Sequence, residues 1–144
     1  MADTKDLAGR KAIVTGSATG LGRSIALQLA ERGADVIINC TKSVSDAEQT
    51  VADCQAFGAQ ARLVQADVST EEGCRALADA ASTWGRLDIL VNNAGGPPPG
   101  MWSDWDRADW EKALNGNMLT PIALIKAVLP GMIEKRWGRI VNIT

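Results

Sequence analysis

The 144-residue chain is 46% hydrophobic and 22% charged, which is enough for one globular domain with a core and excludes a disordered chain or two full domains. Its formal net charge of −2 leaves no cationic surplus for a phosphate backbone, so nucleic acid is not an expected partner. With no His and no Tyr, the chain has no imidazole or phenol, which excludes a Ser-His-Asp hydrolase and a His-ligated metal.

Short β-branched runs recur along the chain at nearly equal steps, the last step about twice the others. They predict five strands, which begin near Lys11, Asp35, Ala61, Leu87 and Arg139.

Helical spacing of apolar residues fills the gaps between these runs. The predicted core-facing positions are Leu21, Ile25 and Leu29, then Cys74, Leu77, Ala81 and Trp84, and finally Ile122, Ile125, Leu129 and Met132.

Turn and cap residues punctuate this pattern. Ser69 with Glu72 three residues later predicts a capping box that opens the third helix. Glycines stand where helices are expected to end, at Gly33, Gly58, Gly85 and Gly138. The fold class is therefore α/β: strands alternate with helices, which predicts a doubly wound parallel sheet in a single domain over residues 1–144.

A glycine-rich turn follows the first strand directly and opens the first helix. It reads Thr15-Gly16-Ser17-Ala18-Thr19-Gly20-Leu21-Gly22. Such a turn lets the backbone approach a diphosphate, and the helix N-terminus supplies unpaired N–H groups and a positive dipole end. The alternative is a tight turn without a ligand, but the strand before it and the amphipathic helix after it favour a dinucleotide.

Four motifs in order resemble those of the short-chain dehydrogenases/reductases, with the nearest general likeness to bacterial 3-oxoacyl-acyl-carrier-protein reductases. They are the T-G-x-x-x-G-x-G turn, Asp67-Val68 after the third strand, Asn92-Asn93-Ala94-Gly95 after the fourth, and the run Gly138-Arg139-Ile140-Val141-Asn142-Ile143. The resemblance implies a Rossmann-like fold, here truncated after the fifth strand, and hydride transfer between NAD(P)(H) and a small-molecule carbonyl or alcohol. It also implies a homo-dimer or homo-tetramer in the full-length form.

The resemblance carries cofactor binding onto three groups of residues. They are Gly16, Ser17, Ala18, Thr19, Gly20, Leu21 and Gly22 in the turn, Asp67 and Val68 near the adenine, and Asn93, Ala94 and Gly95. Thr41 and Lys42 end the second strand, where dinucleotide folds often place a carboxylate for the ribose 2′-hydroxyl. The nearest carboxylates are Asp35 and Asp46, so Lys42 and its neighbouring hydroxyls favour NADP(H) over NAD(H). The alternative is that Lys42 is a solvated loop charge.

By the same resemblance, Asn117 is the catalytic residue whose backbone carbonyl holds a water in a proton relay. Two alternatives stay open: Asn117 caps a helix beside Gly116, or Asn115 is the relay residue. The family serine is expected immediately after Thr144, and the family Tyr and Lys beyond it. This polypeptide alone is thus expected to bind nucleotide better than it turns a substrate over.

Three functions remain in competition: a reductase or dehydrogenase, a dinucleotide-binding or regulatory module without the acid, and a structural subunit of another reductase. Three scattered cysteines without a C-x-x-C pair suit a reducing cytoplasm. Neither a signal peptide near Met1 to Lys11 nor a membrane span over Ile122 to Ile133 is expected, because Lys126 and Pro130 interrupt the latter.

The segment Gly95 to Gly100 is predicted to be a loop, because it holds Pro97-Pro98-Pro99. Met101 and Trp102 after it either line an apolar acyl or aromatic site or belong to a rigid spacer whose tryptophans pack on the next helix. The last strand is expected to form an apolar edge of the sheet.

Overall fold

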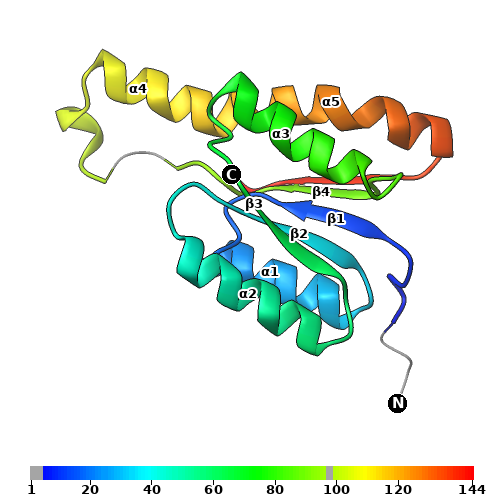
Figure 1. Cartoon of the computed structure of the whole chain (residues 1–144). Helices are drawn as coiled ribbons and strands as arrows, with labels where there is room; N and C mark the ends of the chain where they lie inside the picture. Colours follow the sequence, from blue (N-terminus) through cyan, green and yellow to red (C-terminus); the bar gives the residue numbers. More distant parts are fainter. Residues whose placement is uncertain (1–4, 97–98) are drawn as a thin grey trace.

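The computed structural model describes residues 5–96 and 99–144, and in that part a five-stranded parallel sheet runs through the middle of the molecule (Figure 1). The strands are β1 (Lys11–Val14), β2 (Asp35–Cys40), β3 (Ala61–Gln65), β4 (Ile89–Asn92) and β5 (Arg139–Asn142), in the order β3-β2-β1-β4-β5. The register pairs Val14 with Ile38 on one side and with Val91 on the other. The predicted doubly wound sheet is confirmed.

Helices cover both faces of the sheet (Figure 1). On one face lie α1 (Gly20–Glu31) and α2 (Val44–Ala56), and on the other lie α3 (Glu71–Ser82) and α5 (Thr120–Lys135). The remaining elements are a 3-10 turn η1 (Trp102–Asp104), α4 (Arg107–Leu114) and the π-helical turn η2 (Asn115–Leu119). Alternate residues of the buried strands feed two core clusters, one for each face. Ile13 and Leu90 enter the α3 and α5 side, and Val14 and Val91 enter the other.

Two predicted helix faces are wrong in part. Leu21 is 56% exposed at the start of α1, because the face that meets the sheet is made of Gly22, Ala26 and Ala30. In α5 the sheet buries Leu124, Val128 and Met132, which leaves the predicted Ile122 and Leu129 on an exposed second face. Both faces of α5 are apolar, so spacing alone does not choose between them.

The predicted end of α5 at Gly138 is also wrong. The helix ends at Lys135, and the capping residue Arg136 adopts the left-handed conformation with φ +56°. Gly138 serves close packing instead, because a methyl group placed on it would lie 2.5 Å from the sulfur of Met132. The guanidinium groups of Arg10 and Arg139 lie over the Trp137 ring, 3.6 and 4.6 Å from its centroid.

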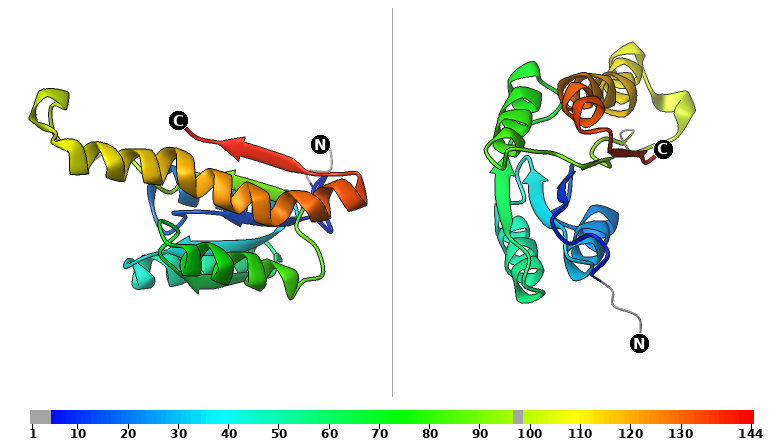
Figure 2. Two further views of the ribbon diagram at one scale, coloured as in Figure 1. Left: turned by 90° about the horizontal axis from the view of Figure 1, so that it is seen from above. Right: turned by 90° about the vertical axis from the view of Figure 1, so that its right-hand side faces the viewer.

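Helices α4, η2 and α5 form one continuous helix over Arg107–Lys135, whose α4 end projects beyond the sheet (Figure 2). By length and composition alone this helix is able to cross a membrane. The core helix of a soluble protein passes the same test, and Leu124 and Val128 are buried against the sheet here. The absence of a membrane span and of a signal peptide stays a prediction. Residues 1–4, Pro97 and Pro98 lie outside the described residues.

All three cysteines are buried free thiols, which yields a first testable expectation. Burial raises the pKa of Cys40 and Cys74, and it raises that of Cys54 to about 11. At pH 8 only about one Cys54 in a thousand is then a thiolate. We expect a disulfide reagent to modify the native thiols at least ~100-fold more slowly than free cysteine, and to modify all three rapidly in denaturant. A native thiol that reacts within about tenfold of free cysteine would contradict this burial.

Candidate functional site

The residues expected to bind a cofactor all follow the carboxyl ends of strands. The glycine-rich turn follows β1, Thr41 and Lys42 follow β2, Asp67 and Val68 follow β3, and Asn93 to Gly95 follow β4. In a parallel sheet these ends share one edge, which is where open α/β sheets bind their ligands (Figure 1). The fold therefore brings the four groups to one side of the molecule.

Asn39, near the end of β2, anchors the glycine-rich turn to the sheet. The buried amide oxygen of Asn39 accepts a hydrogen bond from the Gly16 N–H at 3.1 Å, and the backbone carbonyl of Asn39 accepts one from the Ser17 N–H at 2.9 Å. The Ser17 hydroxyl donates to the Val14 carbonyl at 2.7 Å. The N–H groups of Gly16 and Ser17 thus donate hydrogen bonds to the sheet, and these bonds shape the turn. The residues after them are left to face a ligand.

The other wall of the turn is the segment after β4. The Thr15 hydroxyl oxygen accepts from the N–H groups of Asn93 and Ala94 at 2.9 and 2.8 Å. The Asn93 amide donates to the carbonyls of Thr15 and Gly16 at 3.2 and 3.1 Å. Gly22 fits under this arrangement only because it lacks a side chain, since a methyl group on it would lie 2.3 Å from the Gly16 carbonyl oxygen.

The N-terminus of α1 has no side-chain cap. Thr19 precedes the helix in extended conformation and its hydroxyl makes no capping hydrogen bond, whereas Thr70 and Asp106 do cap α3 and α4. The first N–H groups of a helix have no partner within it, and they carry the positive end of the helix dipole. An anion placed here would be held by the N–H groups that open the helix at Gly20 and Leu21. Ala18, which precedes Thr19, is held in place because its carbonyl accepts a hydrogen bond from the Thr50 hydroxyl of α2 at 3.0 Å.

Thr41 and Lys42 are exposed where β2 ends. Ser43 precedes α2 and, like Thr19, makes no side-chain cap, so its hydroxyl is not held by the helix. Asp35 lies at the opposite end of β2, where it pairs with Lys11 and accepts from the Gln60 N–H. Asp35 is therefore removed from any ribose at this edge.

Asp67 is held by the turn that leads into α3, and Val68 is held by α5. The Asp67 carboxylate accepts from the Ser69 N–H and hydroxyl at 2.9 and 2.6 Å. These hydrogen bonds, with a smaller contribution from the charge of Lys42, lower the pKa of Asp67 below its ordinary value. The Val68 carbonyl accepts from the buried Thr120 hydroxyl of α5 at 2.9 Å.

The predicted capping box of Ser69 and Glu72 is wrong. Because Asp67 takes the Ser69 hydroxyl, α3 begins one residue later, and the Thr70 side chain accepts from the Gly73 N–H at 3.0 Å. Gly73 also lets the helix approach, since a methyl group there would lie 1.8 Å from the Asp67 carbonyl oxygen.

Asn117 lies in the π-helical turn η2, beside the segment after β4. Gly95, at φ +106°, abuts this turn so closely that a methyl group on it would lie 2.6 Å from the Gly116 carbonyl oxygen. The Asn117 amide donates to the Ala113 carbonyl at 2.9 Å, and the helix continues through this turn, so Asn117 does not stand at a helix end. Asn115 points elsewhere and donates to the Ser69 carbonyl. The catalytic role of Asn117 stays a prediction.

Sequence reasoning missed residues that support the glycine-rich turn from the interior of the fold. Asn39 and Thr50 are buried polar residues whose hydrogen bonds converge on the turn. Thr15, which the glycine-rich motif already contained, does the same. The only available signal was an Asn in an otherwise apolar strand, at Asn39, where an unpaired amide would be costly.

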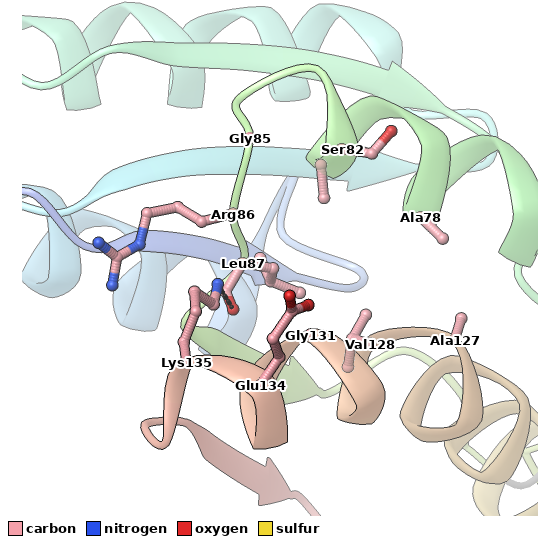
Figure 3. Close-up of a pocket in the computed structure, with 11 residues that line it drawn as sticks. Ala78, Ser82, Gly85, Arg86, Leu87, Ala127, Val128, Gly131, Glu134 and Lys135 are labelled. Carbon is pink, nitrogen blue, oxygen red and sulfur yellow. Dashed lines mark hydrogen bonds between the residues drawn. The ribbon is translucent and has the colours of Figure 1, made fainter.

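A separate cavity of about 380 Å³ lies between α3 and α5 (Figure 3). It is lined in part by Arg86, Leu87 and Lys135, which stand at the amino end of β4, away from the glycine-rich turn. The Lys135 amine donates to the Leu87 carbonyl at 3.0 Å, so it is already engaged. In residues 5–96 and 99–144, no group of three or more His, Cys, Asp or Glu is placed to hold a metal.

The chain matches known proteins along nearly its whole length. The family model of the short chain dehydrogenases matches residues 10–144. The 3-oxoacyl-(acyl-carrier-protein) reductase FabG of Staphylococcus epidermidis is 35% identical over 136 residues, which are 94% of this chain and 56% of that protein. The uncharacterized oxidoreductase YvaG of Bacillus subtilis is 39% identical over 140 residues, 96% of this chain and 52% of its own length.

Solved structures agree with this fold. A 7α-hydroxysteroid dehydrogenase complexed with NADH and 7-oxo glycochenodeoxycholic acid superposes with a TM-score of 0.90 at 36% identity, covering 99% of this chain and 55% of that one. A metagenomic short-chain oxidoreductase in complex with NADP has a TM-score of 0.88 at 32% identity, covering 96% and 63%. The chain spans about half the length of the curated relatives it matches. It belongs to the short-chain dehydrogenase family of oxidoreductases.

Proposed function

We propose that this chain is the NAD(P)(H)-binding portion of an enzyme that transfers hydride between nicotinamide and a carbonyl or alcohol. The observation that carries the proposal is the uncapped N-terminus of α1 behind a turn that Asn39 and Asn93 hold in shape. A dinucleotide diphosphate fits such N–H groups by charge and by hydrogen bonding. The proposed cofactor site comprises residues 16–22, 41–42, 67–68 and 93–95 in one NAD(P)-binding domain over residues 1–144.

Bound nicotinamide would supply or accept the hydride, and the protein must then stabilise or protonate the developing alkoxide. We assign Asn117 to the relay that supplies this proton, because Gly95 seats its helical turn beside the proposed cofactor site. Chain relatives named as 3-oxoacyl reductases make a 3-oxoacyl compound one candidate substrate.

The alternative function is a dinucleotide-binding or regulatory module that holds the cofactor without turnover. The hydrogen-bonded turn and the uncapped N-terminus of α1 support nucleotide binding in either case. The two functions differ in the general acid, whose loss removes on the order of 10²- to 10⁴-fold in rate.

The test is whether the natural gene product oxidises NADPH or NADH in the presence of 3-oxoacyl thioesters or ketones. The oxidation is measured as the loss of reduced-nicotinamide absorbance. Transfer of a deuteride from labelled cofactor to the carbonyl carbon of one of these substrates supports the enzyme. Tight dinucleotide binding without deuterium transfer to any of them would favour the regulatory alternative.

We propose NADP(H) as the preferred cofactor, because Lys42 is exposed where β2 ends and Asp35 is held at the far end of that strand. We expect Lys42→Ala to weaken NADPH binding about tenfold, which is about 1.4 kcal/mol, since one charge-assisted contact with the 2′-phosphate is lost. NADH has no such phosphate, so its dissociation constant should change by less than about twofold. Calorimetric titration measures both constants.

The matched control is Lys126→Ala, which removes an exposed lysine of α5. It should leave both dissociation constants unchanged. Equal weakening of NADPH and NADH by Lys42→Ala, or no weakening of either, would show that Lys42 is a solvated loop charge.

We further propose a cytoplasmic location and a homo-dimer or homo-tetramer for the full-length form. Three buried free thiols suit a reducing compartment. The exposed second face of α5, which includes Ile122, Leu129 and Ile133, is the surface that supports association.

A further inference from the structure

A single buried amide joins the two segments that the proposed cofactor site uses for the diphosphate and for the adenine. Asn39 lies on β2, the strand between β1 and β3 in the sheet (Figure 1). Its side chain contacts the glycine-rich turn after β1 on one side and the exit of β3 on the other. We propose that Asn39 is a positioning residue, which fixes where Asp67 and Val68 stand relative to the diphosphate turn. The inference rests on the proposed function and deepens it.

The Asn39 amide meets one donor and two acceptors. Its oxygen accepts from the Gly16 N–H at 3.1 Å, and its nitrogen donates to the carbonyls of Val64 and Ala66, each at 3.1 Å. A side-chain amide offers an acceptor at one end and two N–H groups at the other, so one orientation satisfies all three contacts. A carboxylate at this position has no proton for the two carbonyls, and an aliphatic side chain makes none of the three bonds.

The contact with Ala66 reaches the residue directly before Asp67. The Asp67 carboxylate is held on its other side by the Ser69 N–H at 2.9 Å. On the side of the turn, the Asn39 backbone N–H donates to the Ser17 hydroxyl oxygen at 2.9 Å. The two segments therefore take their positions from the same residue. A ligand that contacts both segments must match the separation that this residue sets, and it binds more tightly when that separation is fixed beforehand.

The sheet itself does not require this amide. β2 is paired with β1 and with β3 through its backbone, and the residues around Asn39 in the strand are buried and apolar. Asn39 is 2% exposed, and a buried amide is costly unless its partners are present. Its hydrogen bonds serve the two segments beyond the strand ends, which is the expected arrangement for a group that positions a site.

The experiment turns the amide into a titratable group. In Asn39→Asp, the neutral acid still accepts from the Gly16 N–H and donates to one carbonyl, whereas the ionised form faces two carbonyl oxygens without a proton. Burial raises the pKa of a carboxyl group by up to 3–5 units, so we expect the new group to titrate between about pH 6 and pH 9. The ligand is ADP-ribose, which carries the adenine and the diphosphate. Calorimetric titration across this range measures its dissociation constant.

We expect folded Asn39→Asp to bind ADP-ribose within about threefold of the wild type at the acid end, and at least ~10-fold more weakly at the alkaline end. Asn39→Leu should be weakened at least ~10-fold at every pH, because it makes none of the three bonds. The matched control is Gln55→Glu, the same change in an exposed side chain whose amide donates to the Ala61 carbonyl at the start of β3. Its affinity should follow the wild type throughout.

Circular dichroism identifies the pH values at which each variant is folded, and only these are compared. The inference is overturned if the affinity of Asn39→Asp, relative to the wild type, does not fall from the acid to the alkaline end. If the new carboxyl group prevents folding at every pH, Asn39→Leu decides, and wild-type affinity of that variant overturns the inference.

The wild-type chain separates this inference from the proposed function. Wild-type binding of ADP-ribose and NADPH that does not depend on Asn39 defeats this inference alone. Absence of binding of both ligands to the folded wild-type chain defeats the proposed function, and this inference with it.

Discussion

Gly22→Ala is expected to weaken dinucleotide binding more than ~100-fold, because it closes the turn that receives the diphosphate. The added methyl group would lie 2.3 Å from the Gly16 carbonyl oxygen and 2.6 Å from the Asn93 amide nitrogen. Neither neighbour is the free end of a flexible chain: one is backbone, and the other is fixed by hydrogen bonds to Thr15 and Gly16. The turn must open, and the first N–H groups of α1 lose their common direction.

Overpacking of this kind also costs about 1–3 kcal/mol of stability, so the variant is first checked for native circular dichroism. Gly20→Ala provides a milder second variant: its φ of +61° strains an alanine, but no atom lies within 4 Å of the new methyl group. The control is Gly131→Ala, in a helix with open space around it, which should gain up to about 1 kcal/mol and leave binding unchanged. Folded Gly22→Ala protein with wild-type affinity would contradict the assignment of the turn.

Asp88→Ala is expected to have the largest effect on stability, lowering the free energy of unfolding by about 3–5 kcal/mol. The Asp88 side chain is fully buried at the start of β4. Its carboxylate accepts from the Lys11 N–H at 2.8 Å and from Arg86, and it stands 3.7 Å from the Arg10 guanidinium. Lys135 lies 3.9 Å away. Removal of the Asp88 carboxylate takes the shared anionic partner from the cations around it and leaves a strand N–H unpaired.

Denaturant titration of Asp88→Ala measures this loss, and Asp6→Ala is its control. Asp6 also pairs with an arginine, Arg32, but both side chains are about half exposed, so the control should lose far less stability than Asp88→Ala. A loss below about 1 kcal/mol for Asp88→Ala would show that the surrounding cations do not depend on it.

The strands were predictable because each is a short β-branched run between turn residues, and β1, β2, β3 and β5 begin where expected. The fourth begins at Ile89, two residues after Leu87. The glycine turn was predictable for a similar reason, because consecutive residues (a strand, then glycines, then a helix) are sufficient to specify it.

Other features depend on contacts that no local pattern contains. Ser69 and Thr70 are equally good caps, and only the position of the Asp67 carboxylate decides between them. The two apolar faces of α5 are equivalent in spacing, and the sheet selects the one that carries Leu124. Likewise, the sequence places Asn39 only in a strand, and its hydrogen bond with Gly16 depends on the fold that brings the two residues together.

The most direct measurement is a titration of the purified chain with NADPH and with NADH, read by tryptophan emission and by melting temperature. Binding to the folded state at a hundred times Kd contributes about 2.7 kcal/mol, so the melting temperature should rise by roughly 5–10 °C. NADPH should act at lower concentration than NADH. If neither nucleotide changes the emission or the melting temperature of a chain with native circular dichroism, the turn from Gly16 to Gly22 does not bind a dinucleotide.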